Sequence, residues 1–393
     1  MAELQSLQDV LKDINKKFGD NTARVGVDEL TASGTLSFGS PSLDFCVYNH
    51  LVEGKMYEFN GLESSGKTTV AFLVASSYIK KELERNPENP RKILFVDVEC
   101  AADPNWALEA TGYNMNSTNV ETICITPAGQ SAEEIFSMIL RLAKTGEIGL
   151  IIIDSLSMLV SDKLMDDDTM EQKEMGGIAV SLKYFCNKIA GVLNKYKTTL
   201  IGINGLSDNM SGYGDPWVTP GGKAWKRACM GRFRFKQGDF FDEDGNILAK
   251  KDAQSPAGHI IEMYVMKTKI CKWDRKLGML HLNYSRGVDL LQDTIDVATF
   301  FGLIDNSTQG TFKVLDPDTG EVMLDNEGKE IKIRGKKNVK PYFEENLWLW
   351  DKLYKKVYEM LSKRDDPNIV AFEKMLGLNL SERVGQNMNI MEE

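Results

Sequence analysis

Residues 61–69 read Gly-Leu-Glu-Ser-Ser-Gly-Lys-Thr-Thr and match the pattern G-x-x-x-x-G-K-[ST]. Glycines in this pattern let the backbone turn tightly and bring its N–H groups against phosphate oxygens. Lys67 offers a positive charge to β- and γ-phosphates, and the Thr68 hydroxyl offers a ligand to Mg²⁺. The residues expected to bind a nucleoside triphosphate are therefore Gly61, Leu62, Glu63, Ser64, Ser65, Gly66, Lys67, Thr68 and Thr69.

The segments on either side of this loop fit phosphate binding. Residues 55–59 predict a short strand, and residues 69–83 have helical apolar spacing. The phosphates would then lie at a helix N-terminus, where unpaired N–H groups and the helix dipole favour anions. The alternative, a surface turn rich in glycine and serine, is disfavoured by these flanks.

Two further apolar runs end in carboxylates, which hydrolysis of a bound triphosphate requires. Residues 150–154 predict a buried strand ending in Asp154, which could hold Mg²⁺ through water; a simple turn aspartate is the alternative. Residues 93–99 predict a second apolar strand that ends in the carboxylates Asp97 and Glu99. One of these two carboxylates would act as general base.

The order of elements predicts an α/β fold with one large core. Residues 35–288 alternate strand-like and helical patterns, which favours a mostly parallel central sheet flanked by helices and extended by antiparallel strands. We expect a helix and linker at 1–34, a small α+β C-terminal domain at 289–376 and a flexible tail at 377–393. The expected strands are 56–59, 93–98, 150–154, 200–204, 232–235, 260–267 and 279–283.

The composition is that of an ordinary globular protein of 393 residues, with 42% hydrophobic and 26% charged residues. The longest aliphatic run is too short to cross a bilayer, and the N-terminus does not resemble a signal peptide. Six scattered cysteines and three scattered histidines favour reduced thiols over a zinc site or disulfides. We therefore expect a cytoplasmic protein with no membrane partner.

Several motifs in order resemble the bacterial RecA recombinase family. Besides the phosphate loop, they are residues 14–19 (INKKFG), 38–44 (FGSPSLD), 96–104 (VDVECAADP), 153–155 (IDS), 213–216 (YGDP) and 220–222 (PGG). The resemblance runs from about residue 10 to residue 300 and is more specific than the loop alone. It implies a RecA-type P-loop ATPase core that uses ATP and Mg²⁺, with Thr68 and Asp154 at the metal.

The resemblance also assigns roles by position. It implies that Glu99 activates the attacking water, that Asp103 contacts adenine and that Trp106 stacks on it. Read alone, Trp106 fits a core anchor. It further implies that Lys267 and Lys269 reach a neighbouring subunit's nucleotide across a filament interface, although both also fit a solvated strand end. The catalytic residues would then be Glu99, Lys67, Lys267 and Lys269.

Two loops, within 162–177 and from 205 to 222, are expected to line the filament axis and bind DNA. Their N–H groups and lysines can hold phosphates, and an aromatic side chain can stack on bases. The simpler alternative is a flexible surface loop. The residues expected at DNA are Lys163, Gly205, Ser207, Asn209, Ser211, Gly212, Tyr213, Trp217, Gly221, Gly222 and Lys223.

The net charge of −10 argues weakly against nucleic-acid binding unless positive charge is clustered. Two basic stretches, at 223–236 and 329–340, partly answer this objection. The family resemblance implies that the C-terminal domain helps to capture duplex DNA. A solvated basic hairpin explains the second stretch equally well.

Two positions depart from the family pattern. Gly205 stands where the family usually presents a glutamine that senses the γ-phosphate and relays its presence to the DNA loop. The relay must then use Asn204, Ser207 or Asn209, or be weaker. The first loop carries acids at 166–168, which would repel phosphate unless they face away or pair with Lys163 or Lys173.

The sequence as a whole predicts an ATP-dependent homologous recombination protein. It would form a helical filament on single-stranded DNA, pair that strand with a homologous duplex and exchange strands. A helicase-like or regulatory ATPase of the same fold is one alternative, and the spacing of Glu99 and the loop at 213–222 favour the recombinase. A non-catalytic scaffold that binds nucleotide only to recruit partners is another.

Overall fold

The computed structural model describes residues 6–18, 23, 34–48, 50–165, 177–210, 214–249, 253–271, 275–316 and 318–362. The chain divides into two units, Met1–Gly34 and Thr35–Glu393. In the first unit, helix α1 (Leu7–Phe18) lies within the region 1–34, where a helix and linker were expected. Asp9 lies in its first turn, and Lys16 and Lys17 lie in its last turn, as the helix dipole favours.

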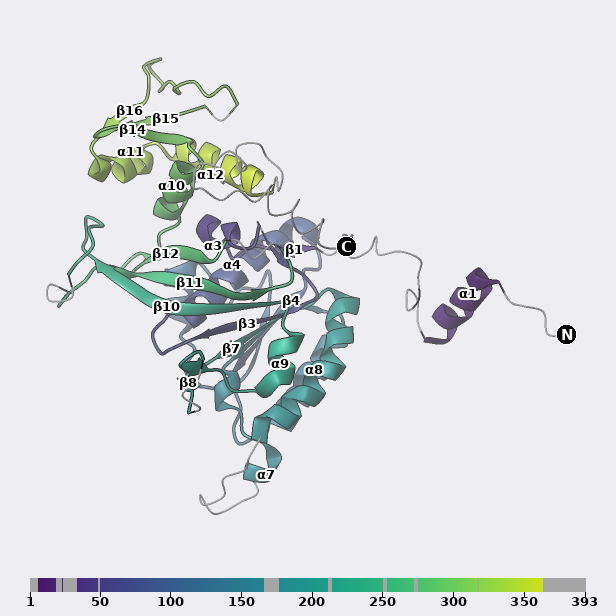
Figure 1. The fold of residues 1–393 in the computed structure, drawn as a ribbon. Coiled ribbons are helices and arrows are strands. Elements are labelled where there is room, and N and C mark those ends of the chain that lie inside the picture. Colours follow the sequence, from purple (N-terminus) through teal and green to yellow (C-terminus); the bar gives the residue numbers. More distant parts are fainter. Residues whose placement is uncertain are drawn as a thin grey trace, which may run out of the picture. The chain divides into compact units, whose positions relative to one another are not determined.

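The second unit is built on a nine-stranded sheet with the order β13-β12-β11-β10-β3-β7-β6-β4-β5 (Figure 1). Six strands pair in parallel: β10 (Gly231–Phe241), β3 (Met56–Gly61), β7 (Thr199–Asn204), β6 (Ile148–Asp154), β4 (Lys92–Asp97) and β5 (Thr122–Ile125). Three continue the sheet in antiparallel fashion: β11 (Gly258–Thr268), β12 (Leu277–Asn283) and β13 (Gly287–Val288). The predicted mostly parallel sheet with an antiparallel extension is confirmed.

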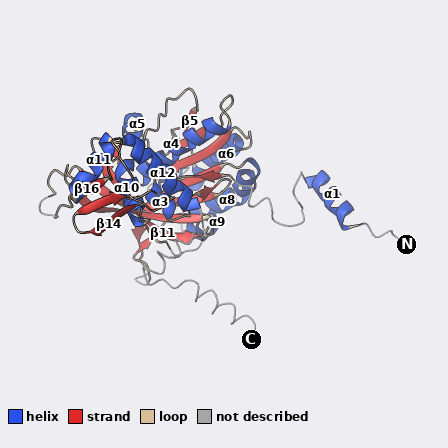
Figure 2. Ribbon diagram, turned by 90° about the horizontal axis from the view of Figure 1, so that it is seen from above, coloured by secondary structure: helices blue, strands red, loops and turns tan. Residues whose placement is uncertain are grey.

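Helices cover both faces of the sheet, and the central parallel strands β3, β6 and β7 are therefore buried on both sides. Along β6, Leu150 and Ile152 pack with one hydrophobic cluster, while Ile151 and Ile153 pack with the other. The first cluster contains α4 (Lys67–Arg85) and α5 (Pro104–Thr111). The second contains α6 (Ala132–Ala143), α8 (Gly177–Tyr196) and α9 (Gly222–Ala228) (Figures 1 and 2).

The C-terminal elements have a hydrophobic cluster of their own. They are α10 (Leu290–Phe300), β14 (Ile304–Thr308), β15 (Thr311–Val314), β16 (Lys332–Arg334), α11 (Val339–Glu345) and α12 (Leu347–Ser362). The turn-rich segment between β15 and β16 forms isolated bridges, Leu315 with Val322 and Leu324 with Glu330. The proposed end of this domain at residue 376 and the tail at 377–393 lie outside the described residues.

Short elements complete the described structure: β1 (Thr35–Leu36), α3 (Pro41–Phe45), β2 (Leu51–Val52), a 3₁₀ turn (Leu156–Met158), α7 (Asp162–Met165), β8 (Ser207–Asp208), β9 (Trp217–Val218) and a second 3₁₀ turn (Lys336–Asn338). None of the helices in the described part of the chain combines the length and apolar character that a bilayer crossing requires.

Candidate nucleotide-binding site

The phosphate loop runs from the end of β3 to the start of α4, as predicted. A side-chain carbon at Gly61 would lie 2.4 Å from the Phe235 carbonyl oxygen, so that only glycine fits there. Gly66 precedes α4 with a φ of +85°, a conformation that side-chain-bearing residues rarely adopt. The backbone path of the loop therefore depends on both glycines.

Lys67 lies folded against the loop. Its ammonium donates a 2.7 Å hydrogen bond to the Leu62 carbonyl oxygen, which also accepts from the Ser65 hydroxyl at 2.7 Å. Burial lowers the pKa of Lys67, and the carboxylates of Asp154 and Glu99 oppose that shift. The lysine is thus placed where the loop and the two carboxylates converge.

The carboxylates meet here because the carboxyl ends of β3, β4 and β6 lie at the same edge of the sheet. Asp97 and Asp154 are direct partners in the register of β4 and β6. Thr68 Oγ1 donates a 2.7 Å hydrogen bond to Asp154 Oδ2. Burial raises the pKa of Asp154 to about 6, although this hydrogen bond acts in the opposite direction.

The two candidates for general base have different surroundings. Asp97 accepts hydrogen bonds from the backbone N–H groups of Ala101 and Ala102, at 3.2 and 3.1 Å, and so fixes the loop after β4. Glu99 is exposed, and its Oε1 accepts a 2.5 Å hydrogen bond from the Ser155 hydroxyl. Both carboxylates line the cavity described next, and the structure gives Asp97 a structural task in addition.

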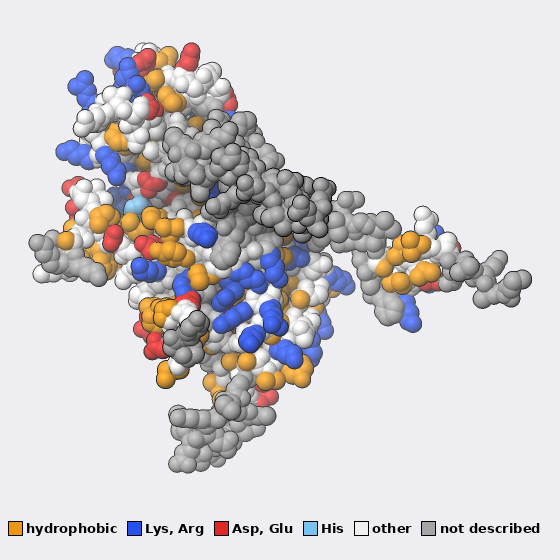
Figure 3. All heavy atoms as spheres, viewed as in Figure 1, with side chains coloured by type: hydrophobic (Ala, Val, Ile, Leu, Met, Phe, Trp, Pro, Cys, Tyr) orange, Lys and Arg blue, Asp and Glu red, His pale blue; other side chains and the backbone are white. Residues whose placement is uncertain are grey.

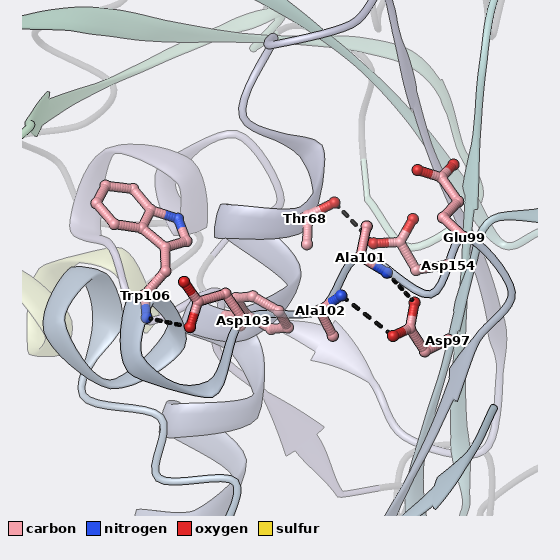
Figure 4. A pocket seen from close by; sticks show the side chains of 9 residues that line it. Thr68, Asp97, Glu99, Ala101, Ala102, Asp103, Trp106 and Asp154 are labelled. Atoms are coloured by element: carbon pink, nitrogen blue, oxygen red, sulfur yellow. Dashed lines mark hydrogen bonds between the residues drawn. The ribbon is translucent and has the colours of Figure 1, made fainter.

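A cavity of about 220 Å³ brings the predicted site residues together (Figure 4). Its lining residues are Thr68, Phe72, Asp97, Glu99, Ala101, Ala102, Asp103, Trp106 and Asp154. Five of them (Thr68, Glu99, Asp103, Trp106 and Asp154) were expected at ATP or Mg²⁺ from the sequence, and they come from three separate stretches of the chain. In Figure 4, Thr68, Glu99 and Asp154 lie toward one end, and Asp103 and Trp106 toward the other.

Asp103 and Trp106 also have structural roles. Asp103 Oδ1 caps α5 by accepting hydrogen bonds from the N–H groups of Asn105 and Trp106, at 2.8 and 3.3 Å. Trp106 is half-buried and packs against the hydrophobic cluster beneath the cavity. This packing agrees in part with Trp106 as a core anchor, and its stacking on adenine stays a prediction.

The surroundings of Thr68 fit a magnesium ion. A hydroxyl oxygen and a carboxylate oxygen lie together beside the phosphate loop, and Mg²⁺ prefers oxygen ligands of this kind. Within the described residues there is no group of three or more histidine, cysteine, aspartate or glutamate side chains that could hold a metal. A metal bound here would therefore take its other ligands from the nucleotide's phosphates and from water.

Lys267 and Lys269 do not line this cavity. Lys267 Nζ donates to the carbonyl oxygens of Lys226 and Cys229, at 2.6 and 2.7 Å, and Lys269 Nζ donates to that of Arg227 at 3.2 Å. These carbonyls end α9, where cations are favoured. The contacts lie beside the amino end of β10, whereas the phosphate loop follows the carboxyl end of β3.

The residues predicted at DNA lie around a small hairpin of β8 and β9. Ser207 is exposed, Trp217 is half-buried and Lys223 is exposed on α9. Asn209 donates from its amide to the Asp215 carbonyl oxygen at 2.8 Å, which braces the hairpin. Sequence reasoning missed Met210, whose side chain is 95% exposed beside this hairpin.

Other predicted DNA contacts are placed differently. Gly221 and Gly222 begin α9 and approach Leu182 and Ala179 of α8 closely, so their small size serves helix packing. Ser211, Gly212, Tyr213, the acids at 166–168, Lys173 and the side chain of Lys163 lie outside the described residues.

The basic stretch at 223–236 is partly neutralised. Arg232 pairs with Glu58, and Arg234 pairs with Asp215 at 2.8 Å. Helix α8 adds exposed lysines that sequence reasoning did not group with α9, and Figure 3 shows lysine and arginine side chains gathered over these two helices. These α8 lysines are Lys183, Lys188 and Lys195. In the second basic stretch, Lys329, Lys332 and Lys340 pair with Glu327, Glu330 and Asp289.

Glu58 is a second residue that sequence reasoning missed. It is fully buried in β3 and accepts hydrogen bonds from Asn204 Nδ2 at 3.1 Å, from Trp225 Nε1 at 3.0 Å and from the Arg232 guanidinium. Asn204 Nδ2 also donates to the Pro220 carbonyl oxygen at 3.1 Å. Glu58 thus ties the strand before the phosphate loop to both ends of the segment 205–222. Its signal in the sequence is a lone acid within an apolar strand.

A family model described as the RecA N-terminal domain matches residues 5–289. The chain belongs to the RecA family. Curated relatives named "Protein RecA" include one from Mycoplasma mobile, 26% identical over 93% of this chain and 99% of that protein. The Desulfotalea psychrophila protein is 30% identical over 77% and 79%, and the Chlorobaculum tepidum protein 27% identical over 92% and 94%.

Membership in the RecA family confirms the predicted RecA-type α/β core. The chain acts in ATP-dependent homologous recombination and repair, the function of this family. The family is one of nucleotide-dependent, DNA-dependent ATPases that bind DNA and form filaments.

Proposed function

We propose that this RecA-family chain hydrolyses ATP to ADP and phosphate in a filament on single-stranded DNA, and that it pairs this strand with a homologous duplex. The observation that carries the proposal is the cavity beside the phosphate loop. It gathers Thr68, Glu99, Asp103, Trp106 and Asp154 from segments far apart in the sequence. Such a set serves nucleotide binding and hydrolysis together, which a site for binding alone does not need.

Each residue has one task in this proposal. The loop N–H groups and Lys67 bind the phosphates, while Asp103 and Trp106 hold adenine. Thr68 and Asp154 would hold Mg²⁺, which neutralises phosphate charge when bound. Glu99 accepts the proton of a water whose oxygen attacks the γ-phosphorus, and the bond to the bridging oxygen breaks as ADP leaves.

The position of Lys267 and Lys269 supports a filament. Both lysines lie at the amino end of β10 and contact α9, away from the phosphate loop of their own chain. A cation acting on phosphoryl transfer must lie at the nucleotide. These lysines therefore act on the nucleotide of a neighbouring subunit, after releasing their contacts with α9.

The DNA surface includes the β8–β9 hairpin and the cations of α8 and α9. Exposed Lys183, Lys188 and Lys223 hold backbone phosphates. Trp217 and the exposed Met210 contact bases at the hairpin. This arrangement grips the backbone and leaves sequence recognition to base pairing.

The test combines three measurements on the purified chain: ATP turnover with and without single-stranded DNA, strand exchange, and DNA affinity at several salt concentrations. We expect turnover to rise with DNA, exchange to require ATP, and affinity to fall steeply with salt. Duplex unwinding without strand exchange would instead identify a helicase-like ATPase. Binding of ATP with no turnover at any DNA concentration would identify a scaffold.

A further inference from the structure

Hydrogen bonds form a continuous chain from Glu99 to the first residue of the segment 205–222. Ser155 Oγ lies 2.5 Å from Glu99 Oε1 and 2.8 Å from Ser157 Oγ. The backbone N–H of Gly205 donates to Ser157 Oγ at 3.2 Å. Two serine hydroxyls thus join the candidate general base to the start of the candidate DNA loop.

The direction of this chain follows from the number of protons. A serine hydroxyl has a single proton to donate, and Ser155 gives its proton to Glu99. The bond between the two serines must then use the proton of Ser157, while Ser157 accepts from Gly205. All three bonds point toward Glu99, so that each strengthens the next. A change at Glu99 therefore reaches the Gly205 N–H.

Because residue 205 is a glycine, Ser157 has room to accept the hydrogen bond from its backbone N–H. Asn204, the residue before it, pairs with Asn60 in the register of β7 and β3, level with the start of the phosphate loop. A side-chain carbon at Gly205 would lie 3.3 Å from Ser157 Oγ, closer than most such contacts. The Ser157 hydroxyl therefore occupies the space that a side chain at position 205 would enter.

The three residues expected to replace the family's glutamine, Asn204, Ser207 and Asn209, are placed less well than Ser155 and Ser157 for a link to Glu99. Asn204 directs its amide to Glu58 and Pro220. Asn209 braces the hairpin through Asp215, and Ser207 is exposed in β8. Ser155, by contrast, is buried beside Asp154.

We infer that Ser155 and Ser157 couple the state of Glu99 to the DNA loop, in place of a side chain at position 205. This inference rests on the proposed function: to accept the proton of the attacking water, Glu99 turns toward that water. Its Oε1 then leaves Ser155, the two hydroxyls reorient, and the hydrogen bond to Gly205 weakens. By linkage, DNA bound to the loop biases Glu99 in return. Ser157 is a positioning residue in this scheme and touches no substrate.

The test measures coupling rather than activity. For each protein, the dissociation constant for single-stranded DNA is determined with ADP and with a non-hydrolysable ATP analogue. The coupling ratio is the constant with ADP divided by the constant with the analogue. In Ser157→Ala we expect this ratio to fall about 10-fold. Ser157→Thr keeps the hydroxyl, and its ratio should stay close to that of the unmodified chain. Ser137→Ala, which removes an exposed hydroxyl bonded only to its own helix α6, should leave it unchanged.

A second measurement needs no variant. Hydrogen exchange at the Gly205 amide of the unmodified chain should be several-fold faster with the ATP analogue than with ADP, since its acceptor is weakened. Equal exchange, or a Ser157→Ala ratio equal to that of the unmodified chain, would overturn the coupling role. A ratio of one in the unmodified chain, with no turnover stimulated by DNA, would overturn the proposed function as well.

Discussion

The Thr68 hydroxyl donates a 2.7 Å hydrogen bond to Asp154 Oδ2, which joins the first turn of α4 to the end of β6. The two residues are 86 positions apart in the chain. They meet because the carboxyl ends of the parallel strands share one edge of the sheet. This contact places the expected metal ligands beside Lys67 and Glu99.

Replacing Lys67 by alanine should weaken ATP binding by about 100-fold or more, because a cation beside the phosphates is lost. Titration calorimetry measures this directly. Lys80, an exposed lysine on the same helix α4, provides the matched control, and Lys80→Ala should bind ATP normally. Ordinary affinity in Lys67→Ala would contradict the assignment of the phosphate loop.

Mixing two inactive variants tests catalysis across an interface. Glu99→Gln and Lys267→Ala should each lose most ATP turnover. In an equal mixture, about one quarter of the interfaces combine an intact Glu99 with an intact Lys267, so turnover should partly return. Steady-state turnover is measured against the mixing ratio. No recovery of turnover at any mixing ratio counts against a shared site. Glu109→Gln, an exposed change on α5, is the matched control for Glu99→Gln and should keep normal turnover.

Glu58→Ala should cost about 3 to 5 kcal/mol of unfolding free energy, because it leaves Arg232, Trp225 and Asn204 without their shared acceptor. Urea denaturation measures the loss. Glu243→Ala, an exposed change in the turn after β10, should alter stability by about 0.5 kcal/mol or less. A loss below about 1 kcal/mol in Glu58→Ala would contradict the role of Glu58.

Asp44 should make stability depend on pH. It is fully buried, it accepts hydrogen bonds from Ser37, the Phe38 N–H and Tyr358, and burial raises its pKa to about 7. Between about pH 4 and 7 the folded chain therefore binds more protons than the unfolded chain, and the unfolding free energy falls as pH rises through this window.

Asp44→Asn removes this titration. From about pH 5 to pH 8 the unmodified chain should lose about 2 to 3 kcal/mol of unfolding free energy relative to the variant, as urea denaturation at both pH values would show. The exposed Asp351 on α12 supplies the control, and Asp351→Asn should follow the unmodified chain. Parallel pH profiles for the unmodified chain and Asp44→Asn would contradict the prediction.

Most of the fold could be predicted because its signals are local. The strand expected at 200–204 is β7 at Thr199–Asn204, and the strand expected at 93–98 is β4 at Lys92–Asp97. Continuous apolar runs mark strands buried on both faces, and turn residues mark their ends. The order of strands in the sheet was not predicted, because strands that follow one another in the sequence are not neighbours in the sheet. β3 and β4, for example, are separated by β7 and β6.

Charges were harder to interpret from the sequence. Arg232 and Arg234 stand in a basic stretch, but alternate residues of a strand share one face. On that face of β10 they meet Glu58 and Asp215, which come from distant parts of the chain. The sequence did not predict that the exposed lysines of α8 lie beside those of α9. Only the packing of the two helices brings these lysines together.

The sequence by itself determined that this chain carries a phosphate loop, strand-end carboxylates and a RecA-family pattern, because each is a short run whose meaning depends on neighbouring residues. Only the tertiary structure decided how these parts connect. No role in coupling follows from the sequence for Ser155 or Ser157, yet they join Glu99 to Gly205 because β4, β6 and β7 end side by side. A hydrogen bond requires two atoms within about 3 Å, and chain folding sets that distance between remote residues.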